Sequence, residues 1–337
     1  GLAERHMKRA SHRGAALLTA MVIVTLVASL AAAMVWRQYR AVQIEAADRT
    51  RAQAGWVLVG ALDWARLILR EDDRASRDVD HLGEVWAVPL AEARLSTFLA
   101  ADKGQGGSTD GDSGDEGIEA FLSGSIEDAQ SRYNLSNVIE PKEPSVVEQR
   151  VMDRLADAAG ISRPVLQRWV AQVRSARHAS PDADDAPLSP RTLEQLAWVG
   201  MDADSRRKLE PWLTFLPTVT PVNFNTAPRE VMAATVEGLD LASAERLVQV
   251  RRNKPFRSLE DIKQQLPEPL RPSIDDKRIS VNSSHYIVTG RLRLDERVME
   301  QRSLVRRRDQ EVVLLRRERV SSLAEAETTK RAPLLAP

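Results

Sequence analysis

An uncharged apolar stretch close to the N-terminus is the feature that most constrains this chain. Residues Ala15–Trp36 read AALLTAMVIVTLVASLAAAMVW. This run of about 22 residues is long enough to cross a bilayer as a helix. Lys8, Arg9, His12 and Arg13 lie close before it. Because basic residues on one flank favour the cytoplasmic side, we predict a single-pass membrane protein with a cytoplasmic N-terminus and its bulk on the other side.

Composition narrows the classes of function. The chain has 337 residues, enough for two domains and an anchor, and its 48 basic and 48 acidic side chains balance. That balance gives no global attraction to nucleic acid. Cysteine is absent, which excludes disulfides and cysteine metal sites, and the five histidines fall in no H-E-x-x-H or comparable pattern. We therefore predict that the protein is not an enzyme and requires no cofactor.

Three interpretations of the apolar stretch compete. A cleaved secretory signal has a shorter apolar region and a small-residue cleavage site, for which Ala31–Ala33 could serve, and a plain anchor requires only length. The third interpretation depends on the glycine that ends the basic leader directly before the apolar run. This arrangement resembles the signal of the type IV pilin superfamily, in which a prepilin peptidase cuts after the glycine and the helix stays attached. The resemblance implies cleavage between Gly14 and Ala15 and methylation of the new N-terminus.

The fifth position after this expected cleavage site carries Thr19. The pilins that the leader resembles have a glutamate there, whose carboxylate pairs with the N-terminal amine of a neighbouring subunit, because an unpaired charge in lipid is costly. A subunit without that carboxylate cannot neutralise the amine of a subunit ahead of it. Thr19 is therefore interpreted as the residue that determines a position at the filament tip. Residues 1–6, before Met7, are interpreted as an expression scar or a wrongly assigned start.

The helix is predicted to continue beyond the membrane. Between Arg37 and Arg70 there is no proline, and Leu58, Leu62 and Leu69 recur at helical spacing. One face of this segment is thus available to pack on a folded domain. A helix that lies half in lipid and half against a sheet is the architecture of pilins.

Strands are expected on both sides of a helical block. A short strand is predicted at Val85–Leu90, followed by a hairpin formed by Phe121–Asp128 and Tyr133–Val138. After the block, three strands are expected to form an antiparallel meander: His285–Leu294, Val298–Arg307 and Gln310–Arg319. Because each group is too small for a stable sheet, we expect one sheet that the block interrupts. The predicted fold class is α+β, with a type IV pilin-like long N-terminal helix packed on an antiparallel sheet and an inserted all-helical domain (SAM-like or helix-hairpin-helix-like).

Changes of pattern set the expected boundaries. Serine and proline recur at first-turn positions of helices between Pro144 and Pro272, and apolar alternation returns after Ile279. Ala101–Gly117 is rich in glycine, serine and aspartate and is expected to be flexible. The expected segments are a leader (1–14), a transmembrane helix (15–36), the pilin-like helix and first strands (37–143), the inserted helical domain (144–275), the returning strands (276–320) and a flexible tail (321–337).

Five ordered motifs carry a more specific resemblance. They are Gly124–Gln130 (GSIEDAQ), Tyr133–Asn137 (YNLSN), Val222–Pro228 (VNFNTAP), Lys254–Ser258 (KPFRS) and Ser280–Tyr286 (SVNSSHY). In content and order they resemble the K-type minor pseudopilins of type II secretion systems, and ordered matches are far more specific than one alone. Each motif alone is typical of a turn or a helix cap, so Asn225, Thr226 and Ser258 are expected to cap helices.

This resemblance implies a role in assembly. A K-type minor pseudopilin would sit in the inner membrane and cap the tip of the pseudopilus with I-type and J-type minor pseudopilins, next to the major pseudopilin, to support protein export across the outer membrane. Prepilin peptidase would be a further partner. The implied mechanism is packing, in which the apolar helix joins a helical bundle and the bulky insertion blocks addition above it.

A DNA-binding alternative comes from the helical block. Asn223–Leu266 resembles a helix-hairpin-helix module, whose G-h-G turn holds phosphate with backbone amides at a helix N-terminus. Here the turn reads Gly238-Leu239-Asp240, and the Asp240 carboxylate is expected to cap its own helix and to repel phosphate. A competence-type DNA-binding membrane protein is thus the alternative function, a membrane-anchored enzyme is a second, and the sequence favours a helical domain that binds no nucleic acid.

A calcium site is left open. Hard oxygen ligands, which calcium prefers, lie at close spacing in one segment: Asp110, Asp112, Asp115 and Glu116. No following glutamate completes an EF-hand loop, so a solvated acidic linker is the competing interpretation. Members of the resembled family often bind calcium and carry an acidic D-W-x-D-x-D stretch in the helical domain. The matching segment here, Arg168–Gln172 (RWVAQ), has no carboxylate.

Overall fold

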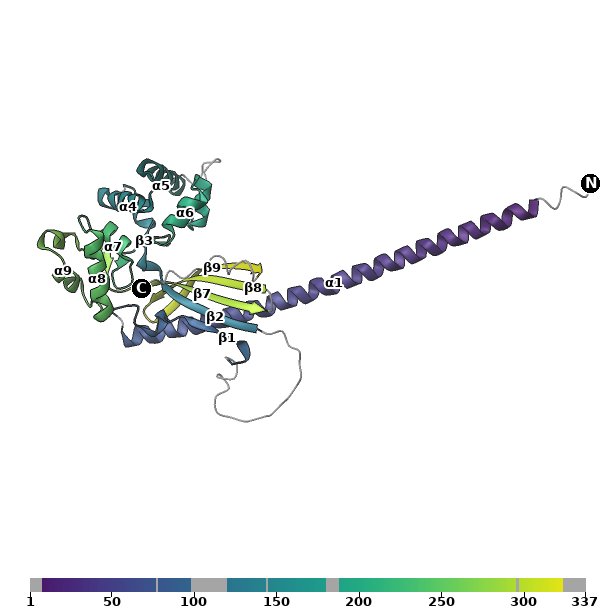
Figure 1. Ribbon diagram of the computed structural model, residues 1–337, viewed down its shortest axis with the longest axis horizontal. Coiled ribbons are helices and arrows are strands. Elements are labelled where there is room, and N and C mark those ends of the chain that lie inside the picture. The colour runs from purple at the N-terminus through teal and green to yellow at the C-terminus, as the bar shows by residue number, and fades with distance from the viewer. Residues whose placement is uncertain are drawn as a thin grey trace, which may run out of the picture. The chain divides into compact units, whose positions relative to one another are not determined.

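The structure is a computed structural model that describes residues 8–76, 78–97, 120–143, 145–179, 188–294 and 297–323, with side chains from residue 16 to 319. It divides into two compact units, Gly1–Val57 and Leu58–Pro337. Helix α1 (Lys8–Ala75) is unbroken and contributes to both units (Figure 1). The expected continuation of the apolar helix beyond the membrane is therefore correct.

The first unit contains the apolar part of α1. In the part of the chain that the structure describes, α1 is the one helix long and apolar enough to cross a bilayer. Its large apolar side chains, from Leu17 to Val42, are exposed. A helix that is apolar on all sides and exposes those side chains suits lipid rather than water.

The second unit is built on one five-stranded antiparallel sheet with the order β1-β2-β7-β8-β9. The helical block separates β2 from β7 along the chain, yet these two strands pair over nine residues, from Ala120 opposite Leu294 to Asp128 opposite Tyr286. The block is thus an insertion into a single sheet, as expected. The strands are β1 (Leu90–Arg94), β2 (Ala120–Asp128), β7 (His285–Leu294), β8 (Arg297–Arg308) and β9 (Glu311–Leu323).

The second half of α1 packs on one face of this sheet. Its buried residues Leu62, Ala65 and Leu69 share a core with alternate residues of the strands, among them Tyr286 and Val288. The spacing of three and four residues on the helix and of two on the strand gives each element one apolar side. Burial of these two sides holds the helix on the sheet.

The insertion forms its own apolar core. Figure 1 shows α4, α5 and α6 grouped together, with α7, α8 and α9 as a second group, and one cluster of buried residues runs through both. The helices begin at identifiable caps, such as Ser145, Asp202 and Ser258. They are α3 (Ser136–Ile139), α4 (Val146–Ala159), α5 (Arg163–His178), α6 (Ala203–Leu209), α7 (Arg229–Thr235), α8 (Leu241–Asn253) and α9 (Leu259–Gln264).

Short 3-10 helices and two-residue strands connect these elements. The 3-10 helices are η1 (Val85–Ala87), η2 (Ala129–Ser131), η3 (Glu194–Val199) and η4 (Glu268–Ser273). The short strands β3 (Tyr133–Asn134) and β4 (Leu213–Thr214) pair in parallel, as do β5 (Val222–Asn223) and β6 (Ile279–Ser280). These pairs fix the ends of the insertion.

Two of the expected strands are wrong. The segment after Asp128 does not form a hairpin with β2, because the Asp128 side chain turns the chain into η2 and β3 then pairs with β4. Val85–Leu90 is η1 followed by the start of β1, because Trp86 is buried and its indole Nε1 donates to Glu84 at 2.7 Å. The expected tail also begins later, since β9 extends to Leu323.

Candidate functional site

A buried polar junction joins the sheet to the insertion. Its centre is Asp128, the last residue of β2, which is 3% exposed. Its Oδ1 accepts a hydrogen bond from the backbone N–H of Gln130 at 2.7 Å. Its Oδ2 accepts from Ser283 Oγ at 2.7 Å and Asn223 Nδ2 at 3.1 Å, and also from Thr226 Oγ1. One carboxylate therefore holds three of the five sequence motifs together.

Asn223 is the second centre of the junction. Its Nδ2 also lies 3.0 Å from Ser283 Oγ and 3.1 Å from the carbonyl oxygen of Asp80, and its Oδ1 accepts from the backbone N–H of Asn225 at 2.9 Å. The side chain is fully buried. An amide fits here because it offers donors and an acceptor at once, and an apolar side chain would leave buried polar groups without partners.

An arginine from the sheet completes the junction. Arg307 on β8 is 4% exposed, and its guanidinium donates to Asp72 Oδ2 at 2.9 Å and to Asp80 Oδ1. The phenol of Tyr286 donates to the same Asp80 oxygen at 2.8 Å, and the guanidinium carbon lies 4.9 Å from the centre of the Tyr286 ring. The end of α1, the following loop and the sheet are thus held by one buried ion-pair cluster.

The second motif fixes the other connection of the insertion. Asn134 Nδ2 donates to the carbonyl oxygen of Thr218 at 2.7 Å, and its Oδ1 accepts from the backbone N–H of Leu216 at 3.1 Å. Asn137 exchanges a pair of hydrogen bonds with the backbone of Thr220, at 2.9 and 3.0 Å. The backbone of residues 216–220, about 80 residues later in the chain, thus forms hydrogen bonds with these two asparagine side chains, where a regular strand would form them with a neighbouring backbone.

The expected helix caps are correct at one of three positions. Ser258 forms a capping box with Asp261 at the start of α9. Asn225 instead bridges two loops, since it exchanges hydrogen bonds with the backbone of Phe256 and donates to the carbonyl of Val281. Thr226 donates to Asp128, and α7 begins after Pro228 without a side-chain cap. Both side chains therefore bind residues outside α7 and do not cap it.

Comparison with known proteins shows which family this chain resembles. The family model described as "Type II secretion system (T2SS), protein K" matches residues 222–282, the segment that runs from β5 to the turn before β7. A Pseudomonas aeruginosa protein named Type II secretion system protein K is 25% identical over 312 residues, which cover 86% of this chain and 87% of that protein. The chain is similar to the type II secretion system protein K family. These matches support a minor pseudopilin of that system.

A second curated relative and a solved structure are also similar to this chain. The Pectobacterium carotovorum protein of the same name is 25% identical over 341 residues, 92% of this chain and 97% of that protein. The fold also matches a chain in the crystal structure of the GspK-GspI-GspJ complex from enterotoxigenic Escherichia coli, with a TM-score of 0.55 and 17% identity over 82% of this chain and 99% of that chain. At this identity the structural match concerns the fold.

Burial shifts the pKa values of titratable groups in and beside the junction. It raises the pKa of Asp128 from 3.8 to about 6, although the surrounding donors oppose the shift. It also raises the pKa of Asp72 to about 6, with the charge of Glu84 adding to the effect and Arg307 opposing it. His285 shifts the other way, because burial and the nearby Arg306 lower its pKa to about 4 and keep the imidazole neutral.

The raised pKa of Asp128 predicts a pH-dependent stability. The pKa of Asp128 in the folded protein lies above the unfolded value of 3.8. The contribution of the protonated side chain to the free energy of unfolding is therefore fully present below pH 3.8, and it is lost as the pH rises through about 6. Over that range the contribution falls by about 3 kcal/mol. The difference in unfolding free energy between the parent and Asp128→Asn, measured by denaturant on residues 37–337, should therefore change by about this amount between pH 4 and pH 7.5.

Asp240→Asn is the matched control, since asparagine also caps helices. The hydrogen bond from Ser243 N–H lowers the pKa of Asp240, so its stabilising contribution is lost as the pH falls, which is the opposite direction. Equal pH profiles for the parent and Asp128→Asn would contradict the assignment of Asp128 as a carboxyl that takes up a proton in the folded state.

Two acidic clusters of this chain have the ligand types of a cation site. Carboxylate oxygens of Asp72, Asp80 and Glu84 lie within 4.8 Å of one another. Arg307 donates to the first two, and Glu84 accepts from Ser76 and from the Trp86 indole, so protein donors already serve these carboxylates. The sequence-predicted calcium ligands lie outside the described residues: Asp110, Asp112, Asp115 and Glu116.

The turn Gly238-Leu239-Asp240 differs from the phosphate-binding turn of helix-hairpin-helix modules. Asp240 Oδ1 accepts from the backbone N–H of Ser243 at 2.6 Å, so the carboxylate caps α8 as expected. The carboxylate thus takes up the Ser243 amide at the start of the helix, where a phosphate would otherwise bind. Arg251, in the last turn of α8, is 8% exposed and donates to the carbonyl of Phe224. Neither residue is arranged to receive a DNA backbone.

The predicted processing residues lie within α1. Gly14 and Ala15 are helical, and their side chains lie outside the described set. The Thr19 hydroxyl donates to the carbonyl of Ala16 at 2.9 Å, which satisfies it within the helix. Sequence reasoning missed Asp80 and Arg307. Strand alternation places Arg307 on the same face as Val305, and that alternation was the signal that could have marked it as buried.

Proposed function

We propose that this minor pseudopilin caps the tip of the pseudopilus together with I-type and J-type minor pseudopilins, above the major pseudopilin, and so supports protein export across the outer membrane. The observation that carries the proposal is the insertion of a whole helical domain into a pilin-like sheet, fixed by the buried junction of Asp128, Asn223 and Arg307. A domain held so firmly cannot swing aside to admit another subunit. Its bulk is a steric reason for a terminal position.

Thr19 supplies an electrostatic reason. Its hydroxyl is already bonded within α1, and it carries no charge that could neutralise the N-terminal amine of a subunit ahead. An ammonium left without a counter-charge at membrane depth costs several kcal/mol, less where water or snorkelling reaches it. A subunit with threonine here therefore fits best where no subunit precedes it.

The anchor and the leader extend the proposal. The single apolar helix suits one pass through the inner membrane, with the N-terminus in the cytoplasm and the second unit in the periplasm. Prepilin peptidase would cut between Gly14 and Ala15 and leave a methylated N-terminus. The protein would act as an assembly component without catalysis, would need no cofactor, and would take calcium only as an optional ligand.

Purification of the tagged full-length chain from native membranes tests this proposal. We expect it to bring down I-type and J-type minor pseudopilins with one copy of this chain per complex, and intact-mass measurement should place its N-terminus at Ala15. A complex without either partner would contradict the assembly role. A chain that starts at Met7 or after Ala33 would contradict the pilin-type processing. Sub-micromolar binding of duplex DNA with a steep salt dependence would favour the competence-type alternative instead.

A further inference from the structure

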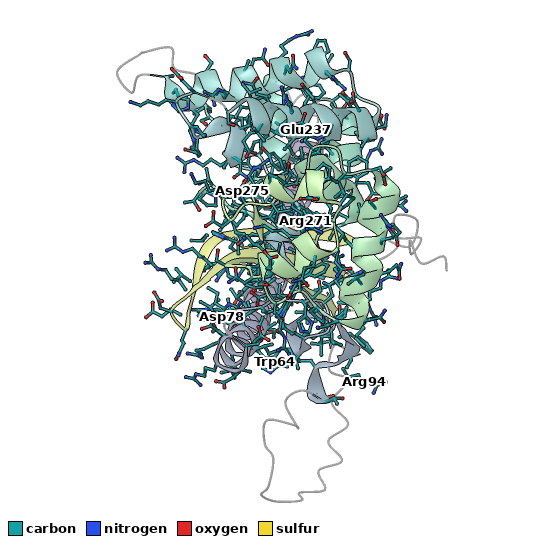
Figure 2. All side chains as sticks on the ribbon, turned by 90° about the vertical axis from the view of Figure 1, so that its left-hand side faces the viewer. Trp64, Asp78, Arg94, Glu237, Arg271 and Asp275 are labelled. Atoms are coloured by element: carbon teal, nitrogen blue, oxygen red, sulfur yellow. The ribbon has the colours of Figure 1, made fainter. Side chains whose placement is uncertain are left out.

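A long groove lies on the insertion, along α4 and α5. It has a volume of about 720 Å³, which is within the range of pockets that hold small molecules. The turn at Gly160 reverses the chain between the two helices, and Gln167 Nε2 donates to Asp153 Oδ1 across them at 2.8 Å. In Figure 2 this part of the insertion lies at the top of the view, beside Glu237, which pairs with Arg150 of α4.

The floor of the groove is apolar. Val138, Met152 and Leu166 form it, and each is no more than 3% exposed, while the half-buried Val170 continues it along α5. The α5 wall runs from Leu166 to His178, roughly 18 Å at the rise of an α-helix. A chain of methylene groups laid along this floor would leave water, which favours its binding.

One end of the groove is cationic. Lys142, Arg174 and His178 line it, and Glu143, which follows Lys142, is not among the lining residues. The Arg174 guanidinium donates only to backbone carbonyls of residues 138–142 and forms no ion pair within the part of the chain that the structure describes. Because carbonyl groups carry no net charge, the positive charge at this end is left to attract an anion.

We propose that this groove binds a long-chain fatty acid, with the acyl chain on the floor of Met152 and Leu166 and the carboxylate at Lys142 and Arg174. The carboxylate meets cations that have no carboxylate partner, which gives a charge-assisted contact. The acyl chain carries no polar group, so it leaves none unpaired on the apolar floor. The inference is independent of the tip role and assigns a ligand to the insertion.

The charges of the groove also set the orientation of the ligand. Asp153 lines the end opposite Lys142 and His178, so a carboxylate is repelled there and attracted at the cationic end. A cationic amphiphile would place like charges together in the reverse way. An extended peptide fits less well, because its backbone groups need partners and those of α4 and α5 are used within the helices.

Photocrosslinking of the full-length chain in nanodiscs of zwitterionic phospholipid tests the proposal. The probe is palmitic acid with a photoreactive group midway along its chain, and peptide mapping locates the crosslinks. We expect crosslinks at Met152, Leu166 and Val170 that excess unlabelled palmitic acid removes. Crosslinks to the apolar part of α1 report how much probe the bilayer holds, so the ratio of groove to α1 crosslinks is the measured quantity.

A charge reversal tests the contact with the carboxylate. Lys142→Glu should lower the crosslink ratio by about tenfold, the value of one charge-assisted hydrogen bond. Lys277→Glu is the matched control, because Lys277 is also an exposed lysine of the insertion but does not line the groove. Equal ratios for the two variants would overturn the proposed carboxylate site.

A groove-filling pair tests the place of the acyl chain. Ala171→Trp puts a large side chain into the groove and should abolish the groove crosslinks, whereas Ala158→Trp, at an exposed α4 position outside the lining, should leave them. Both alanines are exposed, so both variants should fold, and equal melting temperatures check this. Crosslinks confined to α1 in the parent chain, or equal groove crosslinks in the two tryptophan variants, would overturn the proposal. A photoreactive residue at position 171 that crosslinks in cells to a protein helix and not to a fatty acid would also overturn it.

Discussion

Replacing Arg307 with leucine is expected to lower the free energy of unfolding by roughly 3 to 5 kcal/mol, because removal of one partner from a buried ion pair leaves the other charge uncompensated. Asp80 is fully buried and the Asp72 side chain is 9% exposed, and both lose their cationic partner. Burial already raises the pKa of Asp80, so the loss should shrink at low pH, where that carboxyl takes up a proton. Chemical denaturation of residues 37–337 at pH 7.5 and pH 4 measures both effects.

The neighbouring arginine is the control for this prediction. Arg308 pairs with Asp309, but the two side chains are 76% and 87% exposed. Arg308→Leu should therefore change the stability by no more than about 0.5 kcal/mol. The double variant Arg307→Leu with Asp80→Asn should recover part of the loss, since it removes both charges. Equal effects of Arg307→Leu and Arg308→Leu would show that the buried cluster does not stabilise the junction.

Local patterns predicted much of this fold. The strand at His285–Leu294 and the helix at Val146–Ala159 have the expected bounds, because apolar alternation and a serine cap are read within a short window. The long helix and the interrupted sheet were also predictable, since too few strands lay on either side of the block. The resemblance through ordered motifs then identified the family.

The remaining features depend on contacts that are distant in sequence. Tyr133–Val138 has strand-like residues, yet β3 stops at Asn134 because the side chains that follow bind a backbone segment about 80 residues later. The motifs were recognised one by one, but their meeting point at Asp128 is a property of the folded chain. Trp64 looks like one more apolar residue of α1, and only the fold shows that it stays exposed beside a groove.

Labelling of assembled filaments is expected to mark one end only. The proposed tip position rests on two features: buried contacts fix the insertion on its sheet, and position 19 carries a threonine, which has no carboxylate. The bulk of the insertion and the missing carboxylate at position 19 thus both favour a position at the filament tip. Together they predict a single copy per filament, at the end farthest from the membrane.

Immunogold electron microscopy tests this claim most directly. Antibodies against the helical insertion, residues 145–275, would be applied to pseudopili assembled with the major pseudopilin, and antibodies against the major subunit would serve as the control for access to the shaft. Gold is expected at one tip of each filament and not along the shaft. Regular labelling along the shaft would contradict it.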